Sequence, residues 1–347
     1  MAEKGQIRIA LAGNPNCGKT TMFNNITGAK QHVGNYAGVT VEKKEGHTNF
    51  NGRDLLFIDL PGTYSLTARS LDELVARNVI VNDNPDVIVN VLDASNLERN
   101  LYLAAQLLEL EKPMVIALNM ADVAEEMGIK YDFKKMAELT GATIVSTVGR
   151  TNIGTKELLE ATISVAASQK APGVTVNYGD LLEGKIAELV AALEEAGTVT
   201  YPLRWIAIKL LENDPDVVEK VKGFANTEAV LQKAAAIREE IKDQVDLDIV
   251  FQEYRHRYAV EVYNQSLTQA PKEIETRSDR YDKILTHRIW GLPIFMLVMY
   301  LLFAFVNIVG GIPQGWIEDG FAALQAFAVQ NIPDGQLQSL VSDGIVA

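Results

Sequence analysis

Residues 13–20 read GNPNCGKT and bring glycine, lysine and threonine together at a fixed spacing. They follow the apolar run IRIALAG and precede a helix-like segment. Glycines let backbone N–H groups turn toward a phosphate, a lysine can reach the β- and γ-phosphates, and the next hydroxyl can ligate Mg²⁺. The pattern therefore predicts a phosphate-binding loop, or P-loop, rather than an ordinary glycine turn. Its expected nucleotide-binding residues are Gly13, Asn14, Pro15, Asn16, Cys17, Gly18, Lys19, Thr20 and Thr21.

The turn from Asp59 to Gly62 follows the hydrophobic run LLFI. A carboxylate at the end of a buried strand can hold Mg²⁺, directly or through water, and the N–H of Gly62 can contact the γ-phosphate. A strand-ending turn without such a role is the alternative. Thr63 comes next, where Ras-type enzymes use a glutamine to orient the attacking water. We therefore expect slow hydrolysis, or another way of positioning that water.

The stretch from Asn119 to Asp122, NMAD, closes a third apolar run, VIAL. A carboxylate here can accept both N–H groups on the edge of guanine, which adenine lacks. Asn119 can tie this loop back to the P-loop, and Met120 lies between the two polar residues. A helix N-cap at Asp122 is the alternative. Two further candidates, for a backbone contact to the guanine carbonyl, are Ser146 and Thr147.

Strand-like and helix-like segments alternate from residue 6 to about residue 168. This alternation predicts a mostly parallel sheet covered by helices on both faces. The pair Asn51-Gly52 predicts a hairpin that adds one antiparallel edge pair. We therefore expect an α/β fold in which residues 1–168 form a Ras-like P-loop GTPase domain.

The amino-acid composition of the chain changes twice from residue 171 onward. Residues 171–280 are rich in Ala, Glu, Lys and Leu, which predicts an all-α helical domain. Residues 290–310 contain no charge and are numerous enough to cross a hydrocarbon core of about 30 Å. This favours a transmembrane helix over 289–311 rather than a buried core helix.

Charged residues flank that apolar run. Lys283, His287 and Arg288 precede it, and Glu318 and Asp319 follow it. Because positive charge is enriched on the cytoplasmic side of a membrane, we expect the N-terminal side in the cytoplasm.

The overall composition narrows the function classes. The net charge of −13 argues against a protein that binds the phosphates of nucleic acid, which normally carries a basic face. The single cysteine, Cys17, precludes an intramolecular disulfide and fits a reducing compartment. The N-terminus has no basic and apolar regions typical of a secretory signal, and the four histidines show no metal-ligand spacing.

Together these patterns resemble the N-terminal part of a prokaryotic inner-membrane family, ferrous iron transport protein B. The resemblance rests on GNPNCGKTT, VGNYAGVTVEKKEG, DLPGTYSL, NMAD with methionine where most relatives have lysine, and GLPIFMLVMYLLF. It implies a GTP-hydrolysing (G) domain, a helical domain similar to a guanine-nucleotide dissociation inhibitor, and the start of a multi-pass Fe²⁺-transporting plasma-membrane region. Residues 312–347 would be an extracytoplasmic segment or the start of that truncated region.

The resemblance also implies which residues bind the metal ions and which take part in catalysis. Thr40, in the loop HVGNYAGVTVE, would close on Mg²⁺ beside Thr20 and Asp59. A K⁺ ion would replace an arginine finger. Its expected ligands are Asn16 and backbone carbonyls around Gly34 and Tyr36, and the expected catalytic residues are Lys19, Thr40 and Asn16.

One departure from the family is Ala37, where a proline is usual; it predicts a more flexible loop. The implied cofactors and partners are GTP or GDP, Mg²⁺, K⁺, the membrane, Fe²⁺ as the transported ion, small accessory Feo proteins and further copies of the chain. No nucleic acid is expected. Two alternatives stay open: a ribosome- or tRNA-associated K⁺-dependent GTPase, and a nucleotide sensor without enzymatic activity, which Thr63 makes conceivable.

Overall fold

The computed structural model describes residues 5–28, 31–36, 39–67, 69–197, 201–270, 281–282, 284–331 and 335. The described residues up to 270 form one compact unit, and those from 281 onward belong to a second. Ala37, Lys283 and nearly all of the predicted segment beyond residue 331 lie outside the described residues. The boundary expected between residues 168 and 171 stays a prediction.

Seven of the described strands form one sheet in the order β2-β3-β4-β1-β5-β6-β8. Strand β1 pairs in parallel with β4 and β5, and β6 pairs in parallel with β5 and β8. The strands are β1 (Ile7–Gly13), β2 (Gln31–Asn35), β3 (Glu42–Phe50), β4 (Arg53–Asp59), β5 (Val87–Asp93), β6 (Met114–Asn119) and β8 (Thr143–Ser146). The mostly parallel sheet confirms the predicted fold class.

The antiparallel edge is wider than the sequence indicated. The hairpin predicted at Asn51 and Gly52 joins β3 to β4, and both of its turn residues have positive φ, as such a turn requires. Strand β2 adds a second antiparallel pair by binding β3. Its sequence, QHVGN, is polar and contains glycine, so no alternation of apolar residues marks it as a strand.

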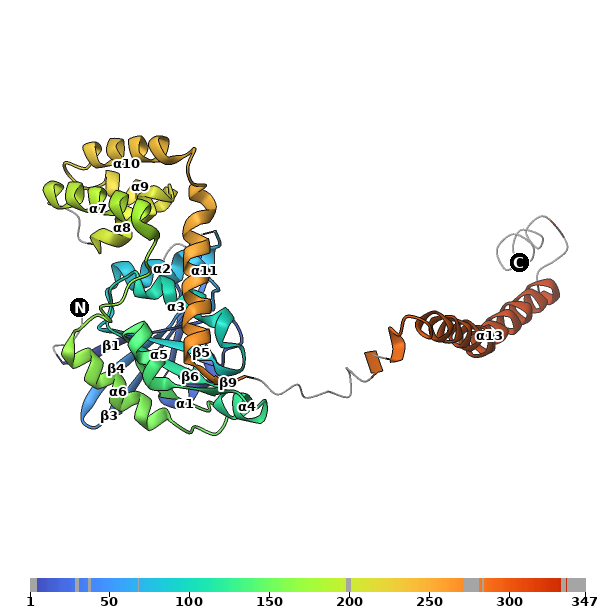
Figure 1. Cartoon of the computed structure of the whole chain (residues 1–347). Coiled ribbons are helices and arrows are strands. Elements are labelled where there is room, and N and C mark those ends of the chain that lie inside the picture. The colour runs from blue at the N-terminus through green and yellow to red at the C-terminus, as the bar shows by residue number, and fades with distance from the viewer. Residues whose placement is uncertain are drawn as a thin grey trace. The chain divides into compact units, whose positions relative to one another are not determined.

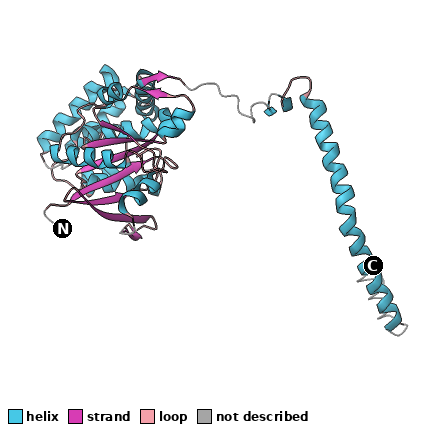
Figure 2. Cartoon of the chain, turned by 90° about the horizontal axis from the view of Figure 1, so that it is seen from below, coloured by secondary structure: helices cyan, strands magenta, loops and turns pink. Residues whose placement is uncertain are grey.

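Helices cover both faces of the sheet, as Figure 2 shows. One face packs against α1 (Lys19–Thr27) and α6 (Thr155–Ser168). The other face packs against a larger group. It comprises α2 (Leu71–Asn82), η1 (Ala94–Asn96), α3 (Leu97–Leu108), α4 (Ala121–Glu126) and α5 (Phe133–Thr140).

The hydrophobic core of this second face continues without a break into the helical region. That region consists of α7 (Gly179–Ala196), α8 (Leu203–Leu211), α9 (Pro215–Lys222), α10 (Glu228–Ile241) and α11 (Leu247–Ser266). Helices α7 to α10 lie together, and α11 runs from them back along the sheet region, where it packs on α3 and α5 (Figure 1). The helical region is therefore fastened to the sheet region along the length of α11.

A two-stranded sheet fixes the end of α11. Strand β9 (Leu267–Gln269) pairs antiparallel with β7 (Lys130–Tyr131). The hydroxyl of Thr268 donates to the carbonyl of Lys130 at 3.0 Å, and the N–H of Asp132 donates to the carbonyl of Ser266 at 2.7 Å. The chain thus leaves the first unit from a strand that is bound to the segment after α4.

The second unit contains α13 (Gly291–Asn331), a helix of 41 residues. It is long and apolar enough to cross a membrane, and its large apolar side chains are exposed. At a rise of 1.5 Å per residue its length is about 60 Å, twice the thickness of a hydrocarbon core. This helix is the candidate span that the sequence predicts over 289–311, and it extends well beyond that stretch.

A buried ionic network joins the helical region to α3. The guanidinium of Arg255, in α11, is completely buried and donates to the carboxylates of Glu109 and Glu212. Lys209 donates to the other oxygen of Glu212 at 2.6 Å. Burial by itself disfavours the charged carboxylate, but Lys209 and Arg255 outweigh it and lower the pKa of Glu212 from 4.5 to about 2.

This lowered pKa predicts an acid-sensitive contribution to stability. Since the folded-state pKa lies below the unfolded value, the Glu212 carboxylate stabilises the fold at neutral pH and loses that effect as the pH falls from 4.5 toward 2. We expect Glu212→Gln to have a lower free energy of unfolding than the wild type at pH 7, and this difference to shrink toward pH 2. Urea unfolding at a series of pH values measures the difference. The exposed Glu219→Gln is the control, and a gap that does not change with pH contradicts the assignment.

Candidate functional site

The three predicted loops lie at one edge of the sheet. Strand β1 is parallel to its neighbours β4 and β5, and β6 is parallel to β5, so all of these strands point the same way. The P-loop, the Asp59 turn and the Asn119 loop follow the carboxyl ends of β1, β4 and β6. Ligands of open α/β sheets bind at this edge. The register places Leu11 beside Asp59 and Asp93 beside Asn119, which brings loops distant in sequence together.

The P-loop is shaped by two residues in left-handed backbone conformations, Asn16 (φ 67°) and Gly18 (φ 86°). At Gly18 a side chain is also excluded by space, because a Cβ there would lie 2.2 Å from Nδ2 of Asn119. That Asn119 amide donates to the carbonyl of Cys17 at 2.8 Å, and its Oδ1 accepts the N–H of Gly149 at 2.8 Å. The predicted tie between Asn119 and the P-loop is therefore present.

Lys19 is directed toward the Asp59 turn. Its ammonium group donates to the carboxylate of Asp59, and to the carbonyl of Leu60 at 2.5 Å. Both charged side chains are buried, with 8% and 7% of their surface exposed. Charge-assisted hydrogen bonds of this kind are strong in a low-dielectric site. An anion that binds the P-loop must therefore compete with Asp59 for the lysine.

Cys17 and Thr63 are both buried beside the P-loop. Burial raises the pKa of the Cys17 thiol to about 11, which keeps the side chain neutral at physiological pH. The backbone N–H of Thr63 donates to the carbonyl of Gly13 at 3.3 Å. A buried Thr63 is poorly placed to orient a water molecule.

Asp122 does not cap its helix. The N-cap of α4 is Met120, at φ 58°, and no side-chain cap bond is formed there. Instead, Nη2 of Arg150 donates to Oδ2 of Asp122 at 3.1 Å. The carboxylate of Asp122 thus lines a cavity and pairs with the guanidinium of Arg150.

Three cavities adjoin along these loops. The Asp122 cavity, of about 330 Å³, shares Gly18, Thr21 and Met120 with the P-loop cavity, of about 550 Å³. The P-loop cavity in turn shares Lys19, Thr20 and Gly62 with the Asp59 cavity, of about 650 Å³. We call this row of cavities the groove. The shared lining residues place the three cavities in order from a carboxylate, past the P-loop, to a second carboxylate.

The residues expected at the metal sites are placed differently from one another. The exposed Thr40 lines the Asp59 cavity together with Thr20. Asn16 lines the P-loop cavity. Gly34 lies in β2, paired with Lys43, and the carbonyl of Tyr36 accepts the N–H of Val39 at 3.2 Å. Neither Gly34 nor Tyr36 lines the groove.

The residues expected to contact the guanine carbonyl, Ser146 and Thr147, are not among those that line the groove. Ser146 ends β8, and the hydroxyl of the buried Thr147 donates to Oδ1 of Asn119 at 3.4 Å. The Asp122 cavity is also lined by residues with no motif around them: Val123, Glu126, Val148, Gly149 and Arg150. The sequence signal near the last three is a pair of glycines, Gly149 and Gly154, in the loop between β8 and α6.

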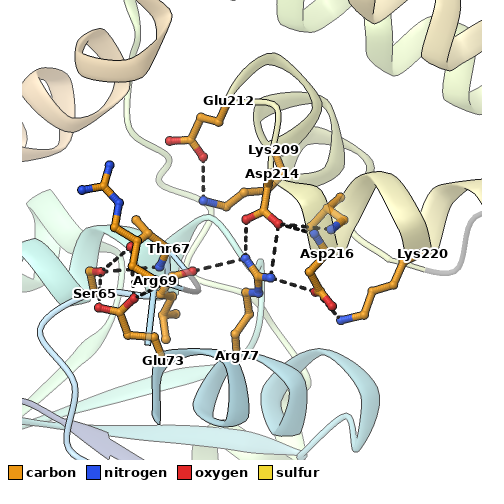
Figure 3. Close-up of polar contacts among 12 residues, drawn as sticks. Ser65, Thr67, Arg69, Glu73, Arg77, Lys209, Glu212, Asp214, Asp216 and Lys220 are labelled. Carbon is orange, nitrogen blue, oxygen red and sulfur yellow. Dashed lines mark hydrogen bonds and ion pairs between the residues drawn. The ribbon is translucent and has the colours of Figure 1, made fainter. Parts of the chain in front are cut away.

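The loop after Gly62 is bound to α2, and α2 to the helical region, as Figure 3 shows. The carboxylate of Glu73 accepts the hydroxyls of Ser65 and Thr67 and the N–H of Arg69. One turn further along α2, the fully buried Arg77 donates to Asp214 at 2.5 Å and to Asp216 at 2.7 Å. The loop that borders the groove is thereby linked to the start of α9.

Comparison with known proteins agrees with this architecture. Residues 7–162 match the family described as "Ferrous iron transport protein B", and residues 178–268 match "FeoB cytosolic helical domain". The crystal structure of an S. thermophilus NFeoB mutant bound to GDP is 34% identical, with a TM-score of 0.70, over 76% of this chain and all of that one. The chain belongs to the ferrous iron transport protein B (FeoB) family.

Further FeoB proteins resemble this chain. The cytosolic domain of T. maritima FeoB in a GMPPNP form is 31% identical, with a TM-score of 0.67, over 76% of this chain and 99% of that one. An Fe(2+) transport protein A/FeoB fusion protein of Porphyromonas gingivalis is 38% identical over 98% of this chain. The chain spans 41 to 51% of the length of the curated relatives it matches.

These matches confirm the predicted family. They give no support to a ribosome- or tRNA-associated GTPase, which the P-loop pattern by itself allows.

Proposed function

We propose that this chain binds GTP and GDP in the groove and hydrolyses GTP. The observation that carries the proposal is the order of the residues along the groove, from Asp122 past the P-loop to Asp59. A nucleotide has the same order of groups: a base edge with N–H donors, then phosphates, then a bound cation. Relatives described with GDP and with GMPPNP support the choice of guanine.

The donor set fits Mg²⁺. Among the described residues no group of three or more His, Cys, Asp or Glu side chains could hold a metal by itself. The hydroxyls of Thr20 and Thr40 and the carboxylate of Asp59 border one cavity. Mg²⁺ prefers oxygen ligands and usually takes one or two carboxylates plus phosphate oxygens. In this proposal Lys19 leaves Asp59 for the phosphates, which frees that carboxylate for the ion.

Hydrolysis needs positive charge beside the γ-phosphate and a held water molecule. With Thr63 buried, we assign the charge to K⁺ at Asn16, completed by backbone carbonyls around Gly34 and Tyr36. Neither Gly34 nor Tyr36 lines the groove in this structure, so this assignment requires these two residues to move toward Asn16 when nucleotide binds. Lys19, Thr40 and Asn16 are the proposed catalytic residues.

We further propose that the chain is part of a plasma-membrane Fe²⁺ transporter, with its G and helical domains in the cytoplasm and α13 as a membrane span. Residues 1–168 would be the G domain and residues 171–280 the helical domain, with the membrane region beginning near residue 289. Fe²⁺ would be the transported ion of the whole protein. The fusion of transport protein A with FeoB in P. gingivalis supports an accessory Feo protein as a partner.

GTP turnover in K⁺ and Na⁺ tests the enzymatic proposal. With Mg²⁺ present, we expect phosphate release by the chain in detergent micelles to be roughly tenfold faster in K⁺, because a fixed cation stabilises the transition state. Asn16→Ala should remove this gain, whereas Asn49→Ala, a change at an exposed position on the β3–β4 hairpin, should keep it. Equal rates in both salts would overturn the K⁺ assignment. If the chain binds GTP but releases no phosphate in either salt, the result would favour a nucleotide sensor without enzymatic activity.

A further inference from the structure

The ion pair between Arg150 and Asp122 occupies the end of the groove. Arg150 follows β8 in a turn whose backbone is held by its own hydrogen bonds, from the N–H of Thr151 to the carbonyl of Val148 at 3.1 Å and from the N–H of Val148 to Ile153 at 3.0 Å. Its side chain is 80% exposed. The arginine can therefore leave Asp122 without disturbing the turn that carries it.

Arg150 offers Asp122 the same kind of donor as guanine does. A guanidinium and the edge of guanine are both planar and present adjacent N–H groups, which suit the two oxygens of a carboxylate. Nη2 of Arg150 already bonds to Oδ2 of Asp122, and both residues line the Asp122 cavity. A base that uses both carboxylate oxygens must take the place of this bond.

We propose that Arg150 acts as an internal competitor of the guanine base: it pairs with Asp122 in the empty groove and is displaced when nucleotide binds. The inference rests on the proposed function, since it takes Asp122 as the residue that binds the base. Arg150 is thus a positioning residue, which acts on nucleotide affinity through Asp122.

The same arrangement exists at the other end of the groove, where Lys19 pairs with Asp59. The two pairs differ in burial. The side chains of Lys19 and Asp59 are nearly inaccessible, whereas those of Arg150 and Asp122 are 80% and 27% exposed. Exposed ion pairs are weak and are screened by salt. The competition by Arg150 should therefore be modest, roughly two- to fivefold in affinity, and should fade at high ionic strength.

The sign of the effect separates this proposal from simple electrostatics. Removing a cation near a polyanionic nucleotide ordinarily slows association and weakens binding. If Arg150 competes with the base, its removal has the opposite result. Lys156 provides a matched control because it is also exposed, lies six residues along the chain and pairs with Glu160 rather than with a groove residue.

The experiment is stopped-flow binding of a fluorescent GDP analogue to the 347-residue chain in detergent micelles, at about 50 and 500 mM salt, since screening grows strongly over this range. Arg150→Ala is expected to bind the nucleotide two- to fivefold more tightly at low salt, with no difference at high salt. Arg150→Lys should behave like the wild type, because a lysine can keep the ion pair. Lys156→Ala should bind equally or more weakly than the wild type.

The double variant, with Arg150→Ala added to Asp122→Asn, completes a double-mutant cycle. Asparagine cannot form the ion pair, so adding Arg150→Ala there should no longer tighten binding. Equal or weaker binding by Arg150→Ala at low salt, in the natural background, would overturn the proposal. A merely structural role of Arg150 would give that weaker binding, and it would persist at high salt. A wild-type chain that binds no GDP would instead refute the proposed function itself.

Discussion

Replacing Asp122 by asparagine is expected to change the preferred purine from guanine to xanthine. Guanine carries an amine at C2, which donates to a carboxylate, whereas xanthine carries a carbonyl there, which needs a donor such as the asparagine amide. Sites built on buried or partly buried hydrogen bonds reject the mismatched partner strongly, since a polar group is left unpaired. We expect the ratio of GDP to XDP affinity to fall by at least about a hundredfold.

Competition between GDP and xanthosine diphosphate for the chain in detergent micelles measures this ratio. Glu126→Gln is the matched control because Glu126 lines the same cavity, and the same chemical change is made four residues along the chain. That variant should keep the guanine preference. If Asp122→Asn also keeps it, Asp122 does not read the base, and the orientation proposed for the nucleotide in the groove is wrong.

Replacing Arg77 by methionine is expected to cause a large loss of stability. Arg77 pairs with the carboxylate of Asp214 (Figure 3). The side chain of Arg77 is completely buried, and that of Asp214 is 5% exposed. Removing the guanidinium leaves this carboxylate without its ion-pair partner in a poorly hydrated place. Breaking one side of a buried pair typically costs about 3–5 kcal/mol. Asp214 keeps its bonds to the N–H groups of Asp216 and Val217, which favours the lower end of that range.

The free energy of unfolding by urea, followed by near-ultraviolet circular dichroism, measures the effect. Lys222→Ala breaks an exposed pair with Glu219 and should cost less than about 1 kcal/mol. Adding Asp214→Asn to Arg77→Met removes the stranded charge and should recover part of the loss. A loss below about 1 kcal/mol for Arg77→Met would mean that solvent reaches Asp214 in the folded protein.

The sequence predicts the sheet and the P-loop well because both depend on local patterns. Apolar runs ending in Gly13, Asp59 and Asn119 fix three strands, and their parallel arrangement brings the following loops to one edge. The contact between Asn119 and Cys17 follows from that placement. The short strands β2, β7 and β9 leave no such pattern, since they are polar or only two to five residues long.

Long-range ionic contacts are the part that the sequence does not reveal. Arg77 and Asp214 are 137 residues apart, and each looks like an ordinary charge on a solvated helix. Arg150 is an exposed residue of a loop, and periodicity says nothing about such a position. Only the folded backbone shows that the first pair is buried between α2 and α9, and that the second closes one end of the groove.

The pairing of β9 with β7 determines where the chain leaves the first unit. Helices α7 to α10 depart from the sheet region after α6, and α11 brings the chain back along α3 and α5 before the segment that leads to α13. Helices α7 to α10 are thus attached to the sheet region at both ends, through α6 and α11. In mechanical terms, a pull on the chain beyond residue 270 is borne first by the pairing of β9 with β7, beside Lys130, which lies eight residues after Asp122.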